Sequence, residues 1–179
     1  MLLLFVKEIR RFMFQINDLI VYGQIGVCKV TDISVPDFCK DSNRLYYTLE
    51  PVSHRGTVFC PVDTNVYMRP ILSREEAEDL ITMIPGIAAA SCTASNMQEL
   101  NHHYSELMRS HNYEDLISLL ISIYTKKNNR IQNNQKIGTV DETYMKRAES
   151  LLYAELSVSL EIPEEDVPHY IAEKLGQKI

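Results

Sequence analysis

The sequence predicts an α+β protein in which a small SH3- or Tudor-like β-barrel domain is followed by an all-α helical bundle. Three observations predict this class. Short segments rich in β-branched residues and bounded by polar turns occupy residues 14–72. After Ile71 the spacing of apolar residues becomes helical. Ser73, followed three residues later by Glu76, is the capping-box pattern that marks the start of a helix.

The strands of the first domain follow from their composition and from the turns between them. Leu19–Tyr22 predicts a short apolar strand, and β-branched residues predict a second strand over Val27–Ile33. The clearest hairpin joins Leu45–Glu50 to Thr57–Val62. Val66–Arg69 would add a last short strand. Several short strands in so few residues favour a small, twisted barrel.

The predicted hairpin has two distinct faces, because side chains alternate along a strand. Tyr47 and Leu49 share one face, and Tyr46 and Thr48 share the other. On the return strand, parity places Phe59 opposite its apolar neighbours. An aromatic side chain there indicates either a binding surface or packing within the barrel or under the helical domain. The polar segment Pro36–Asn43 predicts a loop.

Helical periodicity predicts three helices in the first part of the second domain: Arg74–Ile84, Asn96–Ser110 and Tyr113–Asn128. Ile87–Ala94 is small and apolar and predicts a loop or short turn. The third helix has the strongest apolar pattern and the widest apolar face, so we expect it to be central and mostly buried.

The end of the chain predicts two further helices after an Asn-rich loop at Asn128–Lys136. Thr139 and Glu142 predict a second capping box. Pro163 suits the first turn of a final helix that runs to about Leu175. One apolar face of the helix that starts near Thr139 is marked by Met145, Ala148, Leu152, Leu156 and Leu160.

The sequence divides into a possible N-terminal extension at 1–12, a β-domain at 13–72 and a helical domain at 73–179. The apolar run Leu2–Val6 is too short for a membrane helix, and its charges follow it, unlike those of a signal peptide. Met13 begins a clean domain start and is an alternative first residue. Four cysteines without any close pair indicate reduced thiols that mostly fill the core, which favours the cytoplasm.

The charge of the chain is acidic overall but uneven. The formal net charge is −6, which opposes binding dominated by DNA phosphates. Residues 126–147, however, hold six Lys and Arg residues against two acids. This basic patch suggests weak, non-sequence-specific contact with phosphate, although a solvated helix end would have the same composition.

Nothing in the sequence indicates an enzyme, a cofactor or a metal site. His102 and His103 are adjacent on a predicted helix, so their side chains point about 100° apart and do not converge. His103 and Glu99 share a face, but two ligands are too few for a typical metal site. Serine-nucleophile, zinc-protease and phosphate-loop patterns are all missing from the sequence.

Several segments resemble the CarD-type (CarD/CdnL/TRCF RNA-polymerase-interaction-domain) bacterial transcription regulators. Phe14–Val30 reads FQINDLIVYGQIGVCKV and is similar to the opening of that family. Tyr46–Leu49 (YYTL) and Val58–Val62 (VFCPV) resemble its hairpin, and Ala148–Leu156 (AESLLYAEL) resembles a late helix. The order and spacing carry the resemblance, which extends from about Met13 to about Leu160.

The resemblance implies that the β-domain binds the RNA polymerase β subunit by extending its sheet, a mode in which alternate side chains give specificity. The residues expected at this interface lie on the outer face and turn of the hairpin. They are Tyr46, Thr48, Arg55, Thr57 and Phe59.

The resemblance also implies that the helical domain touches promoter DNA at the upstream edge of the transcription bubble, where the family places an Asn-Trp pair. Asn96–Met97 is the matching pair, and the chain contains no Trp. Met is among the side chains that wedge between base steps, although a Met on a helix often belongs to the core. The phosphate contacts expected around this pair are Lys126, Lys127, Arg130, Lys146 and Arg147.

The main hypothesis is therefore a transcription regulator that alters the stability of the open promoter complex. The alternative is a polymerase-bound adaptor without DNA contact, whose acidic helical domain binds another protein. Either protein is expected to be a cytoplasmic monomer associated with the nucleoid through polymerase. The direction of regulation and the target promoters do not follow from the sequence.

Overall fold

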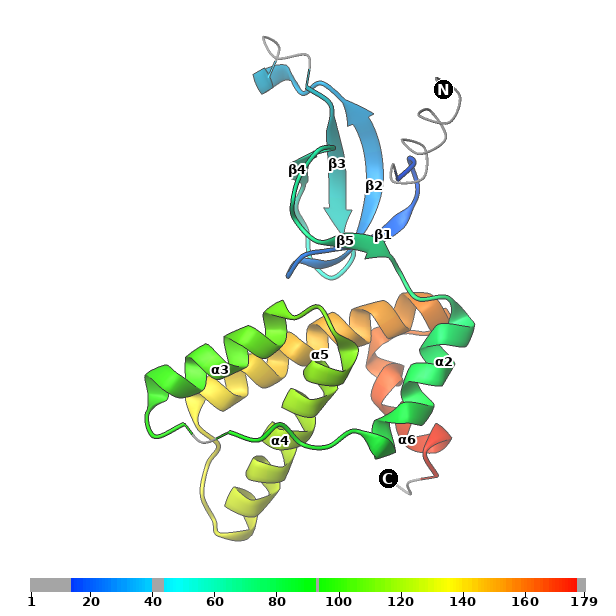
Figure 1. Ribbon diagram of the computed structural model, residues 1–179. Coiled ribbons are helices and arrows are strands. Elements are labelled where there is room, and N and C mark those ends of the chain that lie inside the picture. Colours follow the sequence, from blue (N-terminus) through cyan, green and yellow to red (C-terminus); the bar gives the residue numbers. More distant parts are fainter. Residues whose placement is uncertain (1–13, 40–43, 93, 177–179) are drawn as a thin grey trace, which may run out of the picture. The chain divides into compact units, whose positions relative to one another are not determined.

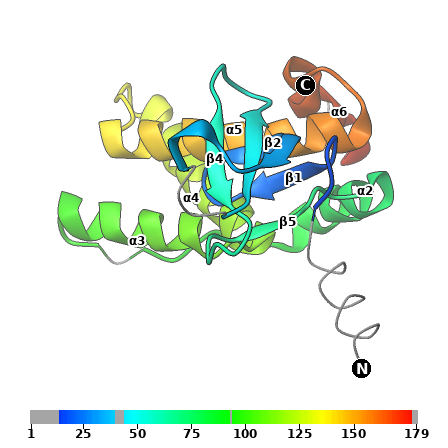
Figure 2. The ribbon, with the colours of Figure 1, turned by 90° about the horizontal axis from the view of Figure 1, so that it is seen from above.

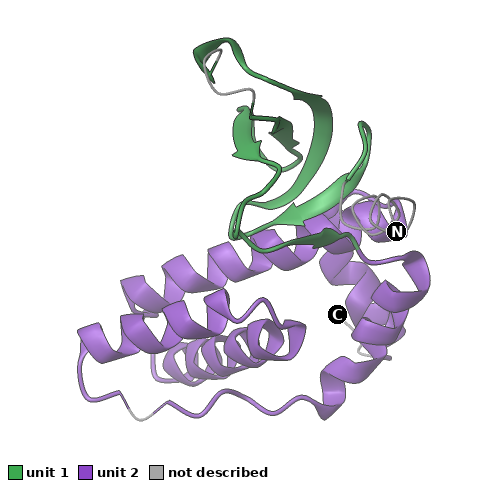
Figure 3. Ribbon diagram, turned by 45° about the horizontal axis from the view of Figure 1, so that its top comes forward, with its two compact units in different colours: residues 1–71 green, residues 72–179 purple. Residues whose placement is uncertain are grey.

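The computed structural model describes residues 14–39, 44–92 and 94–176, which form two compact units. Unit 1 lies within Met1–Ile71 and unit 2 within Leu72–Ile179, drawn in green and purple in Figure 3. The possible extension at 1–12 and the alternative start at Met13 lie outside the described residues.

Unit 1 is an antiparallel sheet whose strands pair in the order β4-β3-β2-β1-β5. The sheet is strongly curved (Figure 1). Its strand pattern confirms the β-branched and hairpin assignments made from the sequence. The strands are β1 (Leu19–Tyr22), β2 (Gly26–Ser34), β3 (Tyr46–Pro51), β4 (Val58–Pro61) and β5 (Met68–Pro70).

The core of unit 1 confirms the predicted alternation of side chains. Tyr47 and Leu49 of β3 are buried, whereas Tyr46 and Thr48, which alternate with them along the strand, are only half-buried. The buried set on this inner face consists of Ile20, Cys28, Val30, Tyr47, Leu49 and Cys60. None of the four cysteines, all of which lie among the described residues, forms a disulfide. Cys28 and Cys60 fill the core as expected, whereas Cys92 is exposed, so the core interpretation holds for only part of the set.

The secondary-structure elements of unit 2 are all helices within its described residues, which confirms the α+β class. Its α-helices are α2 (Arg74–Met83), α3 (Met97–Arg109), α4 (Tyr113–Gln132), α5 (Thr139–Leu160) and α6 (Val167–Lys174). The predicted capping box at the start of α2 is present, because Ser73 Oγ accepts from Glu76 N–H and Glu76 accepts from Ser73 N–H. The described residues also contain short 3-10 turns: η1 (Asp37–Cys39) in unit 1, and η2 (Ile84–Gly86) and η3 (Glu164–Asp166) in unit 2.

The centre of unit 2 is α5, and the expectation that Tyr113–Asn128 would be the central helix is wrong. Helix α5 packs against α2, α3, α4 and α6, and α3 lies alongside its N-terminal half (Figures 1 and 2). Its predicted apolar face is buried along its whole length, from Met145 to Leu160. Helix α4 packs mainly against α3 and α5. A strong apolar pattern shows that a helix has one apolar face, but it does not show how many other helices pack against that helix.

Helix α4 is also longer than predicted, and the loop expected at Asn128–Lys136 starts only after Gln132. Asn has only a weak intrinsic preference against helix, so a short Asn-rich run does not stop one that is already formed. The helix ends where Asn134 takes a left-handed φ of 53°, which Asn tolerates. The N–H of Gln135 then donates to the carbonyl of Arg130 at 2.8 Å.

The predicted capping box at Thr139 is wrong. Gly138 is the N-cap of α5, no side chain caps it, and Thr139 is the first helical residue. A Cβ atom at position 138 would lie only 3.0 Å from Asp141 Oδ2. The missing side chain thus leaves room for the buried Asp141 carboxylate.

The final helix begins at Val167, later than predicted. Pro163 instead precedes the separate 3-10 turn η3. A continuous helix would need an N–H at position 168, but Pro168 has none and is tolerated only in a first turn. The predicted end is confirmed, since α6 stops at Lys174 and Gly176 has a φ of 66°.

Candidate functional site

The first candidate surface lies on the outer face of the β3–β4 hairpin. The strand register sets Thr48 opposite Phe59 and Tyr46 opposite Pro61. Phe59 is 45% exposed, so packing within the core of the barrel is wrong for this side chain. Because β4 is at the end of the pairing order, this face adjoins an edge strand with free backbone groups.

Phe38 belongs to the same surface, although it was not among the residues predicted for the interface. The 3-10 turn η1 places its ring 5.2 Å from the ring of Phe59 and 5.9 Å from that of Tyr46, both edge to face. Phe38 is 65% exposed. It lies in a segment predicted to be a polar loop, for which no side-chain contacts were expected. A single large aromatic residue in a polar loop can nevertheless indicate a binding site. We call Phe38, Tyr46, Thr48 and Phe59 the aromatic face.

Polar contacts hold the segments beside the aromatic face. Tyr46 Oη lies 3.4 Å from Cys39 Sγ, a hydrogen bond that raises the pKa of Tyr46 and ties η1 to β3. Arg44 Nε donates to Asp63 Oδ1 at 2.9 Å, which lowers the pKa of that carboxyl and joins the start of β3 to the chain after β4. These contacts therefore restrain Cys39 at the end of η1 and Arg44 just before β3.

The other two residues predicted for the polymerase interface lie beside the aromatic face. Arg55 is exposed in the turn between β3 and β4, and Thr57 is exposed just before β4 begins. The structure therefore gathers Tyr46, Thr48 and Phe59 on one face and leaves Arg55 and Thr57 at its border.

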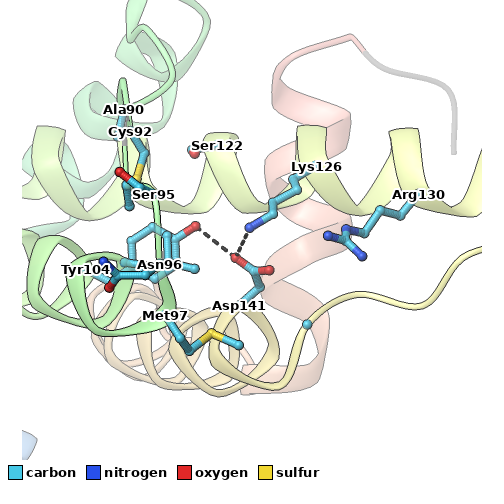
Figure 4. Close-up of a pocket in the computed structure, with 13 residues that line it drawn as sticks. Ala90, Cys92, Ser95, Asn96, Met97, Tyr104, Ser122, Lys126, Arg130 and Asp141 are labelled. Atoms are coloured by element: carbon cyan, nitrogen blue, oxygen red, sulfur yellow. Dashed lines mark hydrogen bonds and ion pairs between the residues drawn. The ribbon is translucent and has the colours of Figure 1, made fainter.

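The second candidate surface is a cavity of about 500 Å³ in unit 2, bordered by the start of α3 (Figure 4). Asn96 is the N-cap of α3, and its Oδ1 accepts from the N–H groups of Gln98 and Glu99. Met97 follows and is 60% exposed, so the core interpretation of this residue is wrong. We call this cavity the α3 pocket. Its lining includes Asn96, Met97, Tyr104, Lys126, Arg130 and Asp141.

A buried carboxylate lies at the base of the α3 pocket. Asp141 is 2% exposed, and its Oδ1 accepts from Tyr104 Oη at 2.9 Å and from Lys126 Nζ at 2.7 Å. These two partners come from α3 and α4, whereas Asp141 belongs to α5 (Figure 4). Burial, and secondarily the hydrogen bond to Asp141, raises the pKa of Tyr104, so the phenol stays protonated as a donor.

The predicted phosphate contacts separate into two groups. Lys126 and Arg130 line the α3 pocket with Asn96 and Met97, so sequence positions 30 residues apart meet there. Arg130 also donates to the carbonyl of Lys136 at 3.2 Å, which orients its guanidinium.

The remaining three cations are outside the pocket lining. Lys127 lies 5.9 Å from the centre of the Tyr124 ring, and Arg147 lies 5.7 Å from that of Tyr144. Lys146 is exposed and pairs with Glu142 at 2.8 Å on the same helix face, which lowers the pKa of Glu142. An exposed pair of this kind leaves the lysine available to an anion.

Other site chemistries find little support in the part of the chain that the structure describes. No group of three His, Cys, Asp or Glu side chains there is placed to hold a metal ion. His102 instead faces Glu106 at 3.3 Å, one turn along the exposed side of α3. Within the same residues, each helix is too short or too polar to cross a lipid bilayer.

Comparison with known families points to the same unit as the aromatic face. The family model described as CarD-like/TRCF RID domain matches residues 14–72, a range that holds the described residues of unit 1 and Leu72. No curated protein matches the chain. The match identifies these residues as a Tudor-like RNA-polymerase-interaction domain, a type of domain that binds a protein.

Proposed function

We propose that this protein, whose residues 14–72 match the CarD-like/TRCF RID family, is an RNA-polymerase-interacting transcription factor with two activities. Unit 1 binds the β subunit of RNA polymerase through the aromatic face. Unit 2 alters the stability of the open promoter complex through weak, non-sequence-specific contacts of the α3 pocket with DNA. The protein acts as a cytoplasmic monomer that reaches the nucleoid on polymerase.

The observation that carries the first part is the exposed pair Phe38 and Phe59. Two large aromatic rings lie in contact beside the outer face of the sheet, and both are exposed. Exposed apolar patches of this kind usually mark interaction sites. Strand addition at β4 would supply main-chain hydrogen bonds, and the two rings would supply the side-chain specificity. Aromatic side chains are also the residues that most often dominate binding energy at protein interfaces.

The test is direct binding of the full-length protein to a fragment of the polymerase β subunit. Phe59→Ala should weaken binding by about tenfold or more, which corresponds to roughly 1.4 kcal/mol and is modest for an interface hot spot. The matched control is Val66→Ala, because Val66 is 44% exposed in the same unit but outside the aromatic face. Equal binding by the two folded variants would reject the aromatic face as the interface.

The second part is supported by the position of Met97. An exposed apolar side chain at the first residue of α3 lines the same pocket as two cations, Lys126 and Arg130. Apolar wedges beside cations are the arrangement that minor-groove proteins use to unstack a base step. Because the chain is acidic overall, such contacts suffice only when polymerase holds unit 2 near the promoter.

Met97→Ala should shorten the lifetime of the polymerase open complex several-fold, and it should barely change the melting temperature because Met97 is exposed. Ile131→Ala is the matched control, since Ile131 is 59% exposed on α4 and does not line the α3 pocket. Lifetimes would be measured by competitor challenge. An unchanged lifetime with Met97→Ala would exclude the wedge.

A second groove favours the adaptor alternative. Thr82, Met83, Ile87 and Glu114 help to line a cavity of about 570 Å³ between the end of α2 and the start of α4. Met83 is 51% exposed, and Asp115 adds a second carboxylate, so the groove suits a basic partner segment with an apolar side chain. Under this alternative, Met83→Ala changes transcription in the reconstituted system and Met97→Ala does not.

A further inference from the structure

The buried carboxylate of Asp141 has contacts that phosphate binding does not explain. It joins α5 to α3 through Tyr104 and to α4 through Lys126, all on the single atom Oδ1. Asp141 is 2% exposed, whereas the side chain of Lys126 is 35% exposed. A buried charge is tolerated only when it is paired and hydrogen-bonded, and these two donors satisfy that requirement.

The start of α5 also fits this carboxylate. Asp141 lies in the first helical turn, where the helix dipole favours negative charge. The N-cap Gly138 leaves space beside Asp141 Oδ2, because a Cβ atom at position 138 would lie only 3.0 Å from that oxygen. The carboxylate therefore occupies the position that an anion from outside would take, and Lys126 is already engaged with it.

One face of α3 connects Asp141 to the rim of the α3 pocket. Met97, Leu100 and Tyr104 follow a spacing of three and seven residues, and all three line the pocket. The hydrogen bond at Tyr104 fixes the rotation of α3 about its axis. Tyr144 of α5 adds a second restraint by donating to the carbonyl of Asn101 at 3.1 Å.

We propose that Asp141 is a positioning residue for the DNA-facing rim of unit 2, and that Lys126 is its counter-ion and not a phosphate contact. Asp141 holds α3 through Tyr104 so that Met97 projects at the mouth of the pocket. Lys126 neutralises the carboxylate and ties α4 to the same point. This inference rests on the proposed DNA role of Met97, and it reassigns one cation of the basic patch from binding to support.

The first experiment separates a counter-ion from a phosphate contact. Lys126→Met leaves the Asp141 carboxylate buried without its cation, so the open-complex lifetime should fall several-fold. Adding Asp141→Asn removes the unpaired charge and keeps an acceptor for Tyr104, so the double variant should recover most of the lifetime. A phosphate contact cannot be recovered in this way, and a double variant as defective as Lys126→Met would overturn the proposal.

Lys127→Met is the matched control on the neighbouring residue. Lys127 does not line the pocket, and it stays available for phosphate in the proposed function. If it binds one phosphate, its removal should lower the slope of log affinity against log salt by about 0.9. An unchanged slope would count against the proposed phosphate contacts at this residue and would leave the role of Asp141 to the other variants.

The second experiment tests whether Asp141 acts through Met97. Asp141→Ala should shorten the open-complex lifetime about as much as Met97→Ala, and the double variant should be no worse than either single variant. Leu152→Ala, in the buried face of α5, provides a stability control that lowers the melting temperature without touching the pocket.

Additive effects of Asp141→Ala and Met97→Ala, or an equal loss of lifetime in Leu152→Ala, would overturn the positioning role. Failure of Met97→Ala to change the lifetime would instead remove the proposed DNA function on which this inference rests. Binding to the polymerase β fragment should be unchanged in all of these variants, because their substitutions lie in unit 2.

Discussion

At the scale of single residues, burial separates the cysteines into two chemical classes. Cys28 is fully buried in unit 1, and this burial raises the pKa of its thiol to about 11. Cys92 is exposed and lines the α3 pocket. Since only the thiolate reacts quickly with disulfide reagents, and only when a reagent can reach it, the two residues should differ greatly in rate.

We therefore expect Cys92 to react first with a colorimetric disulfide reagent at pH 8, and Cys28 to react only after unfolding. The sign follows from the raised pKa: below about pH 11, the buried thiol of Cys28 stays largely protonated and unreactive. Stopped-flow absorbance with a Cys92→Ser control would assign the fast phase. A fast phase that survives in Cys92→Ser would contradict this assignment.

Labelling of Cys92 also reports on the α3 pocket itself. If DNA covers the pocket in the open complex, the Cys92 reaction should slow when polymerase and promoter are present together. Polymerase alone should leave it unchanged.

At the scale of secondary-structure elements, the start of α5 shows how tertiary contacts override capping preferences. Ser is a better N-cap than Gly in isolated helices, and Ala usually restricts the unfolded chain. At Gly138, however, a Cβ atom would meet Asp141 Oδ2 at 3.0 Å. Asp141 has little freedom to move because Tyr104 and Lys126 hold it.

Gly138→Ala is therefore expected to destabilise the protein by about 1 kcal/mol or more, as overpacking does, and Gly138→Ser should give no gain. Gly86→Ala is the control, because no atom lies within 4 Å of the added Cβ there and its φ is not in the left-handed region. Urea denaturation would measure both variants. A more stable Gly138→Ala would show that Asp141 yields easily, which would weaken its role as a positioning residue.

At the scale of the whole molecule, net charge and local charge act in opposite directions. The formal charge is −6, yet residues 126–147 carry most of the lysines and arginines of unit 2. Part of this set is already used, because Lys126 pairs with the buried Asp141, whereas the exposed pair of Lys146 with Glu142 leaves that lysine available to an anion. The cations left for phosphate are few, so DNA affinity without polymerase should be low.

We expect no measurable binding of the isolated protein to promoter DNA at physiological salt, and clear retention when polymerase is added. The physical reason is effective concentration: tethering through unit 1 turns a weak contact into an intramolecular one. Fluorescence anisotropy with labelled promoter would measure the first, and a supershift of the polymerase complex the second. Tight binding without polymerase would contradict recruitment, and Phe59→Ala should weaken the supershift.

How far the sequence predicted the candidate sites depends on the range of the interactions. Phe59 was placed on the outer face by parity alone, because alternation along a strand is a local property. Phe38 was not predicted as a site residue, because its contact with Phe59 spans 21 residues and depends on a 3-10 turn that has no periodic sequence pattern. Likewise, the sequence did not distinguish Lys126 from other surface lysines, because its pairing with Asp141 of α5 depends on how the helices pack.

The sequence by itself determined the α+β class, the strands, the capping box at Ser73 and the buried face of α5, because these follow from local geometry and from the periods of two and 3.6 residues. Only the tertiary structure decided the N-cap of α5, the central position of that helix, the exposure of Met97 and the pairing of Lys126. Each of these depends on contacts between helices far apart in the chain. The Asp141 carboxylate, for example, is buried and therefore requires hydrogen-bond partners, which Tyr104 and Lys126 of other helices supply.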